Sequence, residues 1–192
     1  HIPCDLSLTE SRKDAIGKIQ SETSIWGLVN NASGPATGAS ATSSLDEYQR
    51  AFETHLYASN DFVQALFPKL KVQGAGRIVN IISVTARIPL ENMVVSNTLR
   101  GAMLNWSKTL SKEFGPFNIT VNNVLPGYTE TERLKEVIQG NSSKAGLSYQ
   151  DFSSEIINQI PNFDASILQK IITEKFLKQS CVSNSPKENN HA

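Results

Sequence analysis

Three short apolar runs, separated by much longer amphipathic segments, constrain the fold of this chain more than any other feature. Residues 25–30, 76–82 and 119–125 are rich in branched apolar side chains and have the length of buried strands. Between them, residues 45–70 and 92–114 repeat apolar side chains at intervals of three and four, as helices with one buried face do. Helical connections of this length join parallel strands. The alternation therefore predicts a three-layer α/β/α fold, a doubly wound parallel sheet between layers of helices.

The start of the chain fits the end of a strand followed by a helix. Residues 1–5 lead into Ser7-Leu-Thr-Glu10, which has the spacing of a capping box at the start of a helix. Ser44-Leu-Asp-Glu47 repeats this spacing ahead of the helix predicted at residues 45–70. The chain is thus expected to begin in the middle of its fold.

The last third of the chain has weaker patterns. Two helical segments are expected at residues 130–139 and 149–159, and we interpret them as a lid. Residues 167–177 are amphipathic, and the residues after them contain almost no bulky apolar side chains. We predict one partial dinucleotide-binding domain over residues 1–161, followed by a divergent helix and a disordered tail over residues 162–192.

The charge and composition exclude several classes of partner. The 192 residues contain 18 basic and 18 acidic side chains, so no basic surface for nucleic acid or an anionic membrane is expected. The cysteines Cys4 and Cys181 and the histidines His1, His55 and His191 do not have the spacing of metal ligands. No apolar run approaches the length of a membrane span. We expect a cytoplasmic protein that binds a small molecule or protein and no metal.

A hydroxyl follows the second predicted strand, at the edge where open α/β sheets carry their chemistry. This hydroxyl belongs to Ser83. Ser96 and Arg100 lie four residues apart on the next predicted helix, so a second hydroxyl and a permanent cation share one helix face and look back towards Ser83. We expect these three residues to form the centre of a site.

Several motifs occur in the order and at the spacing of short-chain dehydrogenases/reductases, and they resemble this family over about residues 4–161. Asp5, in Cys-Asp-Leu, resembles the strand-end residue that contacts adenine, and Ser83 matches the serine of the active site. The other matches are to the NNAG stretch and to the VNxVxPGxxxT segment that contacts the nicotinamide half of the cofactor: Asn30, Asn31, Ala32, Asn122, Pro126, Gly127 and Thr131. The resemblance implies a Rossmann-like fold and NADP or NAD as the cofactor.

Two residues depart from the catalytic pattern of the family. Ser96 stands where the family has its catalytic tyrosine, thirteen residues after Ser83, and Arg100 replaces its lysine. This SNxxR pattern resembles a branch described as 3-oxoacyl-acyl-carrier-protein reductases. A serine hydroxyl is a far weaker acid than a phenol, and arginine keeps its proton, so neither can act as the family's acid–base pair unchanged. Arg100 can still donate hydrogen bonds to the ribose of the cofactor.

His55 stands where the family has the asparagine of its proton relay, and histidine titrates near neutrality. We hypothesise that His55 supplies the proton through water while Ser83 and Ser96 bond the carbonyl oxygen. Two structural alternatives stay open: His55 as a half-buried residue of an apolar helix face, and Ser83 as a turn or helix-capping serine. The spacing of the phenols Tyr57 and Tyr128 favours core packing or the rim of the site.

The sequence lacks two parts of the family's fold. No glycine-rich turn precedes Asp5 to bind a pyrophosphate, and no last strand is recognisable after Pro161. We therefore expect a chain truncated at both ends, without the first β-α-β unit and the last strand.

The expected function is NAD(P)-dependent hydride transfer to or from a carbonyl or alcohol, with a 3-oxoacyl thioester as one substrate class. The alternative is an inactive family member that binds a ligand or pairs with homologous subunits. The resemblance also implies homodimers or homotetramers formed through the two long helices at residues 45–70 and 92–114.

Overall fold

The computed structural model describes residues 1–21, 25–127, 138–139, 142–143, 146–151 and 154. The chain divides into two compact units, His1–Gly127 and Tyr128–Ala192, and the fold below is that of the first. Thr131, Cys181, the boundary predicted at residue 161 and the segments predicted beyond it lie outside the described residues. The two helices expected before that boundary are described only in part, with helical residues at 138–139, 149–151 and 154.

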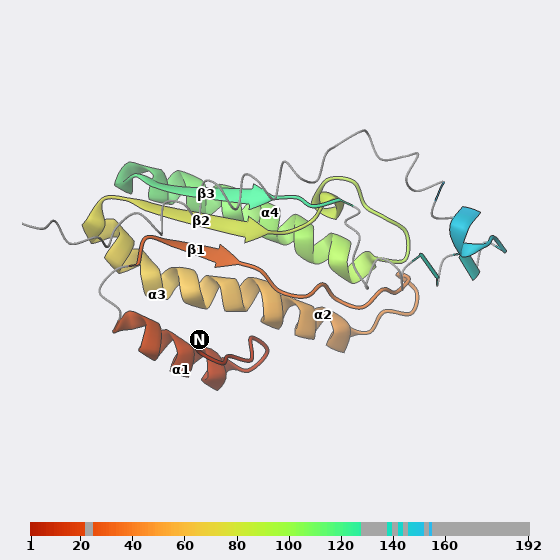
Figure 1. Cartoon of the computed structure of the whole chain (residues 1–192), viewed down its shortest axis with the longest axis horizontal. Coiled ribbons are helices and arrows are strands. Elements are labelled where there is room, and N and C mark those ends of the chain that lie inside the picture. Colours follow the sequence, from red (N-terminus) through yellow and green to blue (C-terminus); the bar gives the residue numbers. More distant parts are fainter. Residues whose placement is uncertain (22–24, 128–137, 140–141, 144–145, 152–153, 155–192) are drawn as a thin grey trace, which may run out of the picture. The chain divides into compact units, whose positions relative to one another are not determined.

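Three parallel strands form the sheet of the first unit. They are β1 (Gly27–Asn30), β2 (Gly76–Ile81) and β3 (Ile119–Val124), in the order β1-β2-β3 (Figure 1). Leu28 pairs with Ile78, which pairs in turn with Val121. The three predicted strands are confirmed, with ends within two residues of those expected. Their carboxyl ends lie at one edge of the sheet.

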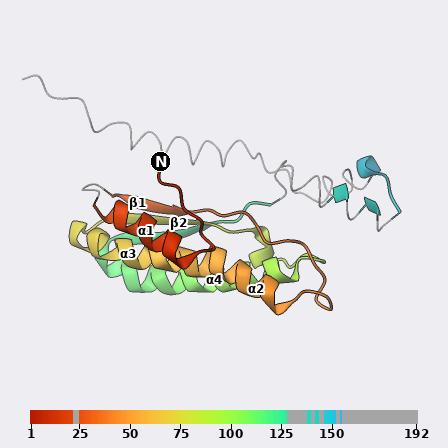
Figure 2. The same ribbon diagram turned by 90° about the horizontal axis from the view of Figure 1, so that it is seen from below.

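Helices α3 (Ala58–Gln73) and α4 (Val94–Phe114) lie on the same side of the sheet (Figure 2). α3 packs against β1 and β2, α4 packs against β3, and α1 (Thr9–Gln20) packs against α3. The Rossmann-like parallel sheet with flanking helices is therefore confirmed. The second helical layer of the three-layer prediction is not among the described elements.

The long helix predicted over residues 45–70 has a wider turn in its middle. α2 (Leu45–Phe52) continues without a loop into a π-helical turn, Glu53–Tyr57, and then into α3. The capping box predicted at its start is confirmed: Ser44 N donates to Glu47 Oε2 over 2.6 Å, and Glu47 N donates to Ser44 Oγ over 3.4 Å. π-helical turns within α-helices occur frequently at functional sites. The turn contains His55.

The capping box predicted at Ser7 and Glu10 is wrong. α1 begins at Thr9, and its N-cap position is taken by Leu8, which makes no side-chain bond to the helix. The Ser7 hydroxyl donates to Asp5 Oδ1 over 2.7 Å, and Ser7 N donates to the same oxygen over 2.9 Å. Because Ser7 is bonded to the side chain of Asp5, two residues earlier, it does not cap the helix.

Apolar side chains fill the space between the helices and the sheet in two clusters. The cluster near the amino ends of the strands includes the stacked rings of Phe67 and Phe114, whose centroids are 4.2 Å apart. The cluster near the carboxyl ends joins α2 and α4 to the end of β2 and comprises Ala51, Ile82, Val95, Leu99 and Met103. Burial of one large apolar side chain contributes roughly 1.5–3 kcal/mol. The second cluster therefore anchors both helices beside the edge where the candidate site lies.

A row of asparagine amides, buried at Asn30 and Asn80 and half-buried at Asn123, crosses the sheet near its carboxyl edge. Asn30, Asn80 and Asn123 are register partners on the three strands. Asn30 Nδ2 donates to Asn80 Oδ1 over 2.7 Å, and Asn80 Nδ2 lies 2.9 Å from Ser107 Oγ on α4 and 3.4 Å from Asn123 Oδ1. Buried polar groups stabilise a structure only when they are paired. These bonds therefore hold the three strands and α4 in one alignment.

Replacing Asn80 by alanine should lower the free energy of unfolding by about 3 kcal/mol, because the buried amide of Asn30 and the half-buried amide of Asn123 lose their common partner. Asn122→Ala is the matched control: its amide is exposed and bonds only Thr120 Oγ1 among the described residues, so its cost should stay within about 0.5 kcal/mol. Urea unfolding of both variants checks this. Equal losses in the two would contradict an aligning role for Asn80.

Candidate active site

Ser83 lies directly beyond the carboxyl end of β2, as predicted. Its backbone is extended, and it is the N-cap of a short 3₁₀ turn, Val84–Ala86, with Ser83 Oγ accepting from Thr85 N over 3.2 Å. The capping contact anticipated as an alternative is thus present. Because the serine oxygen accepts in this bond, its hydroxyl proton can still be donated to a ligand. Ser83 is half-buried, so a ligand can reach it.

The segment after β3 is bonded to the turn that carries Ser83. Ile82 N donates to Val124 O over 2.9 Å, and Val84 N donates to Pro126 O over 3.0 Å. A Cβ at Gly127 would lie 3.7 Å from Val84 Cγ1, an ordinary contact. The structure therefore brings Pro126 and Gly127 beside Ser83. Thr131, from the same motif, lies outside the described residues.

Ser96 and Arg100 are buried on the first turns of α4, with 4% and 5% of their surface exposed. Arg100 Nη1 donates to Ile81 O over 3.4 Å. The guanidinium therefore lies at the end of β2, two residues before Ser83, as the sequence predicted. A buried cation at this position favours a ligand that carries or develops negative charge.

His55 is 3% exposed and lies inside the π-helical turn. It is more deeply buried than the half-buried alternative expected, and it lines two cavities. The first, of about 250 Å³, lies between β1, α1 and α3; the second, of about 220 Å³, is lined by the loop after β1 and by α2. The imidazole of His55 therefore borders both cavities.

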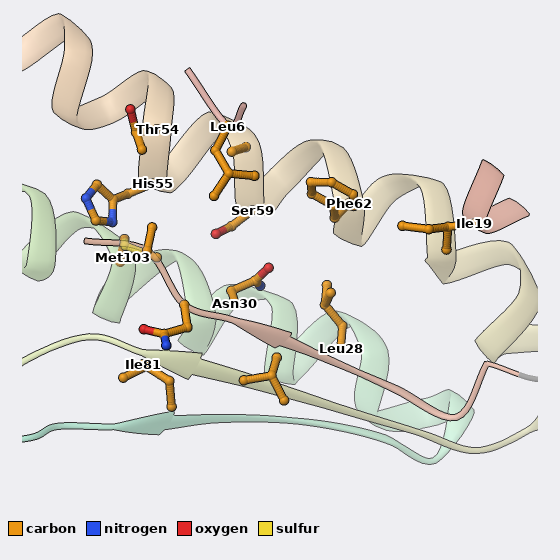
Figure 3. Close-up of a pocket in the computed structure, with 14 residues that line it drawn as sticks. Leu6, Ile19, Leu28, Asn30, Thr54, His55, Ser59, Phe62, Ile81 and Met103 are labelled. Carbon is orange, nitrogen blue, oxygen red and sulfur yellow. The ribbon is translucent and has the colours of Figure 1, made fainter. Parts of the chain in front are cut away.

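The first cavity collects several predicted residues from separate elements (Figure 3). Asn30, Asn31 and Ala32 line it from the end of β1, His55 from the π-helical turn, and Leu6 from the segment before α1. The amide of Asn30 is already bonded to Asn80, which gives this residue a structural role. The remaining wall is mostly apolar and includes Ile19, Leu28, Val29, Phe62, Ile81 and Met103.

Asp5, the predicted adenine contact, has an exposed side chain, and its neighbour Leu6 lines the first cavity. The hydroxyl and backbone N–H of Ser7 both donate to the Asp5 carboxylate. These bonds hold the pKa of Asp5 below its usual value, and burial opposes them only weakly. Asp5 therefore keeps its negative charge in mildly acidic solution.

Asn97, which sequence reasoning did not single out, fastens the loop before α4. Asn97 Nδ2 donates to Leu90 O over 2.8 Å, and Leu90 N donates to Asn97 Oδ1 over 3.4 Å. Gly38, in the loop after β1, joins the same region, since Gly38 N donates to Asn92 O over 2.7 Å. The loops after β1 and β2 are thus joined by a hydrogen bond near the start of α4, which carries Ser96. No local pattern shows this, because the partners come from different loops.

A parallel sheet with flanking helices and with polar side chains beyond its carboxyl edge is typical of the class of open α/β proteins that bind ligands at that edge. Within that class, the family model for short chain dehydrogenases matches residues 1–142. The chain belongs to this family.

Several characterised proteins are similar to the chain over most of its length. The NADPH-dependent reductase BacG of Bacillus subtilis is 28% identical over 158 residues, which are 82% of this chain and 61% of the relative. The ketoacyl reductase HetN of Nostoc sp. is 26% identical over 176 residues, 90% of this chain and 59% of the relative. The chain therefore spans about three fifths of the length of these relatives.

Solved structures agree with this assignment. The crystal structure of YwfH, an NADPH-dependent reductase involved in bacilysin biosynthesis, is 27% identical and superposes with a TM-score of 0.74 over 82% of this chain and 61% of its own. L-Sorbose reductase from Gluconobacter frateurii, complexed with NADPH and L-sorbose, reaches a TM-score of 0.73 over 84% of this chain and 62% of its own. At 22% identity, the second match shows the fold alone.

Two features are absent from the described ranges. Their His, Cys, Asp and Glu side chains form no group of three or more that could hold a metal ion. Among the helices of these same ranges, none combines the length and the apolar character that crossing a membrane requires.

Replacing Ser7 by alanine should raise the pKa of Asp5 back towards its ordinary value of 3.8, because the largest cause of its lowering is the hydroxyl bond. A lowered folded-state pKa stabilises the fold above the unfolded pKa, and this is lost as the pH falls through the folded value. NMR titration of the Asp5 carboxyl measures the change. Ser11→Ala, which removes the acceptor of Asp5 N, is the control and should leave this pKa nearly unchanged.

Proposed function

We propose that this chain carries the catalytic edge of an NAD(P)-dependent oxidoreductase that transfers a hydride to or from a carbonyl or alcohol. The observation that carries the proposal is the convergence of separate elements at one edge of the sheet. Ser83 follows β2, Arg100 reaches the end of the same strand from α4, and His55 lines the cavity beside β1. Membership of the short chain dehydrogenase family supports this interpretation.

The residues present fit one part of the cofactor. Asn31 and Ala32 line the first cavity, Pro126 lies beside Ser83, and Arg100 can donate to ribose hydroxyls. The cavity wall is largely apolar, as suits a planar ring. Pro126 and Gly127 belong to the segment that resembles the family's contact with the nicotinamide half of the cofactor, so these residues would hold that half.

The proposed division of labour follows from the chemistry of each side chain. When bound, the cofactor supplies or accepts the hydride. Ser83 and Ser96 donate hydrogen bonds to the substrate oxygen, and the fixed charge of Arg100 stabilises negative charge that develops there. Neither serine nor arginine exchanges a proton readily near neutral pH, whereas an imidazole does. His55 therefore holds and moves the proton through water.

A finer assignment follows the SNxxR pattern. We propose that the chain belongs to the branch of 3-oxoacyl-acyl-carrier-protein reductases that carry Ser and Arg in place of Tyr and Lys, and that its substrate class is a 3-oxoacyl thioester. The similarity to the ketoacyl reductase HetN supports this class. Both the relative BacG and the solved structure of YwfH are described as NADPH-dependent reductases, which favours NADPH over NADH.

The second candidate is an inactive family member that binds a ligand or pairs with homologous subunits. The loss of Tyr and Lys at Ser96 and Arg100 favours it. The long helix formed by α2, the π-helical turn and α3 also exposes large apolar side chains at Leu45, Tyr57 and Val72. Such exposed side chains would support the homodimer or homotetramer expected through the long helices. Light scattering after size-exclusion chromatography measures the oligomeric state.

The two candidates are separated by cofactor binding and turnover of the 192-residue chain. If it is a reductase, the fluorescence of NADPH should change on binding, and addition of acetoacetyl thioester should consume the cofactor. Binding without consumption of any carbonyl substrate would support the inactive ligand-binding member. Absence of binding to both NADPH and NADH would overturn the proposed oxidoreductase function.

His55→Ala should lower turnover about 100-fold and remove the limb of the pH profile that reports the imidazole, because general acid catalysis is lost. Tyr57→Phe is the matched control in the same π-helical turn. Tyr57 is 50% exposed, so loss of its phenol should leave the rate unchanged. Steady-state kinetics from acid to alkaline pH tests both variants. An unchanged pH profile in His55→Ala would assign the proton to another group.

A further inference from the structure

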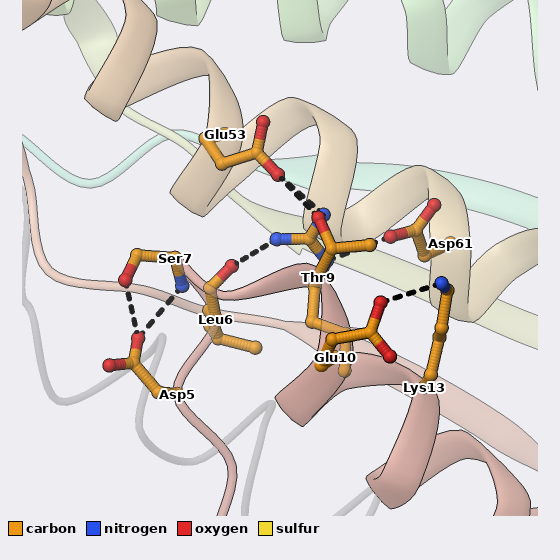
Figure 4. A network of polar contacts seen from close by, with 9 residues as sticks. Asp5, Leu6, Ser7, Thr9, Glu10, Lys13, Glu53 and Asp61 are labelled. Atoms are coloured by element: carbon orange, nitrogen blue, oxygen red, sulfur yellow. Dashed lines mark hydrogen bonds and ion pairs between the residues drawn. The ribbon is translucent and has the colours of Figure 1, made fainter.

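Arg12, on the first turn of α1, is a buried cation whose guanidinium has four hydrogen-bond acceptors. Figure 4 labels the residues that carry these acceptors: Leu6, Thr9, Glu53 and Asp61. Only 3% of the surface of Arg12 is exposed. Its Nε donates to Asp61 Oδ2 over 2.7 Å, and its Nη1 donates to Leu6 O over 2.7 Å. Its Nη2 donates to Glu53 Oε1 over 2.5 Å and to Thr9 Oγ1 over 3.2 Å. All three guanidinium nitrogens are therefore used.

These bonds connect two segments that line the first cavity. Leu6, whose carbonyl accepts from Arg12, lines that cavity from the segment before α1. Glu53 is the first residue of the π-helical turn, and the next two residues, Thr54 and His55, line the same cavity. One side chain thus links Leu6 directly to the turn that carries His55.

Neutralisation of charge does not explain this arrangement. Burial by itself lowers the pKa of Arg12, but its bonds to Glu53 and Asp61 together raise the pKa above the ordinary value. The side chains of Glu53 and Asp61 are 32% and 36% exposed, so water can solvate both without a partner. An apolar side chain of similar length would also fill the space at a lower desolvation cost. What a guanidinium adds is a rigid fork with fixed bond directions.

We propose that Arg12 is a positioning residue that sets the width of the first cavity by holding Leu6 and the Glu53–Tyr57 turn together. Arg12 is not among the residues that line this cavity, so it would act through Leu6 and the turn, which do. The inference rests on the proposed function in one respect: it takes the ligand of the first cavity to be a nicotinamide dinucleotide. Its structural part, the coupling of the segment before α1 to the π-helical turn, is independent of that function.

The first test compares Arg12→Met with Lys13→Met in the full chain. Lys13 is the next residue of α1 and pairs with Glu10. The two side chains are 65% and 83% exposed, respectively, so loss of this ion pair should change little. Arg12→Met should speed amide hydrogen exchange in the segment Leu6–Leu8 and in the turn Glu53–Tyr57, with no change in β2. It should also weaken NADPH binding about tenfold, since the cavity walls are no longer held at the required separation.

A second variant separates positioning from charge balance. Arg12→Met combined with Glu53→Gln and Asp61→Asn leaves no unpaired carboxylate but still lacks the bond to Leu6 O. We expect this triple variant to recover the free energy of unfolding and yet to keep the fast exchange and weak NADPH binding. Recovery of wild-type exchange and affinity would overturn the proposal, because Arg12 would then serve only to balance charge.

The exchange measurement also separates this inference from the proposed function. If the wild-type chain binds neither NADPH nor NADH, the proposed function fails, and the coupling is judged by exchange alone. Unchanged exchange in the Glu53–Tyr57 turn of Arg12→Met overturns the inference, whether or not NADPH binds. Faster exchange at both segments supports it in either case.

Discussion

The buried amide of Asn80 ties the three strands and α4 together just before the strands end. A buried amide without partners is costly, so the favourable register is the one in which Asn30 and Asn123 face Asn80. A slip of one residue would turn these amides to the other face of the sheet. Because Asn31, Ser83 and Pro126 follow within a few residues of this row, the geometry of the candidate site depends on it.

The chemistry of the site follows from what α4 carries to that edge. A permanent cation, Arg100, is buried against the carbonyl of Ile81, beside the turn of Ser83. Hydroxyls and a fixed positive charge stabilise an oxygen that gains negative charge, but they do not exchange protons near neutral pH. The imidazole of His55 complements them from a different helix. Polarisation of the substrate oxygen and proton transfer are therefore assigned to different elements in the proposed mechanism.

The two sides of the first cavity belong to segments far apart in the chain, and their separation is set by directional bonds. Arg12 contacts Glu53 and Asp61, which are 41 and 49 residues away, as well as the carbonyl of Leu6. The neighbouring Lys13 makes an exposed pair with Glu10 on the same helix. Both residues are cations, so charge does not distinguish them. The ion pairs of Arg12 differ from that of Lys13 in their burial and in the distance between the partners along the chain.

The sequence by itself determined the parallel sheet, its strand boundaries to within two residues, the capping box at Ser44 and the family, because periodicity, caps and motif order are local properties of a chain. It also placed Ser83 and Arg100 at the carboxyl edge. Only the tertiary structure decided the amide row, the partners of Arg12, the π-helical turn that buries His55, and the hydrogen bonds from Ser7 to Asp5. In each case local preferences allowed several partners, and the packing of elements distant in sequence selected one.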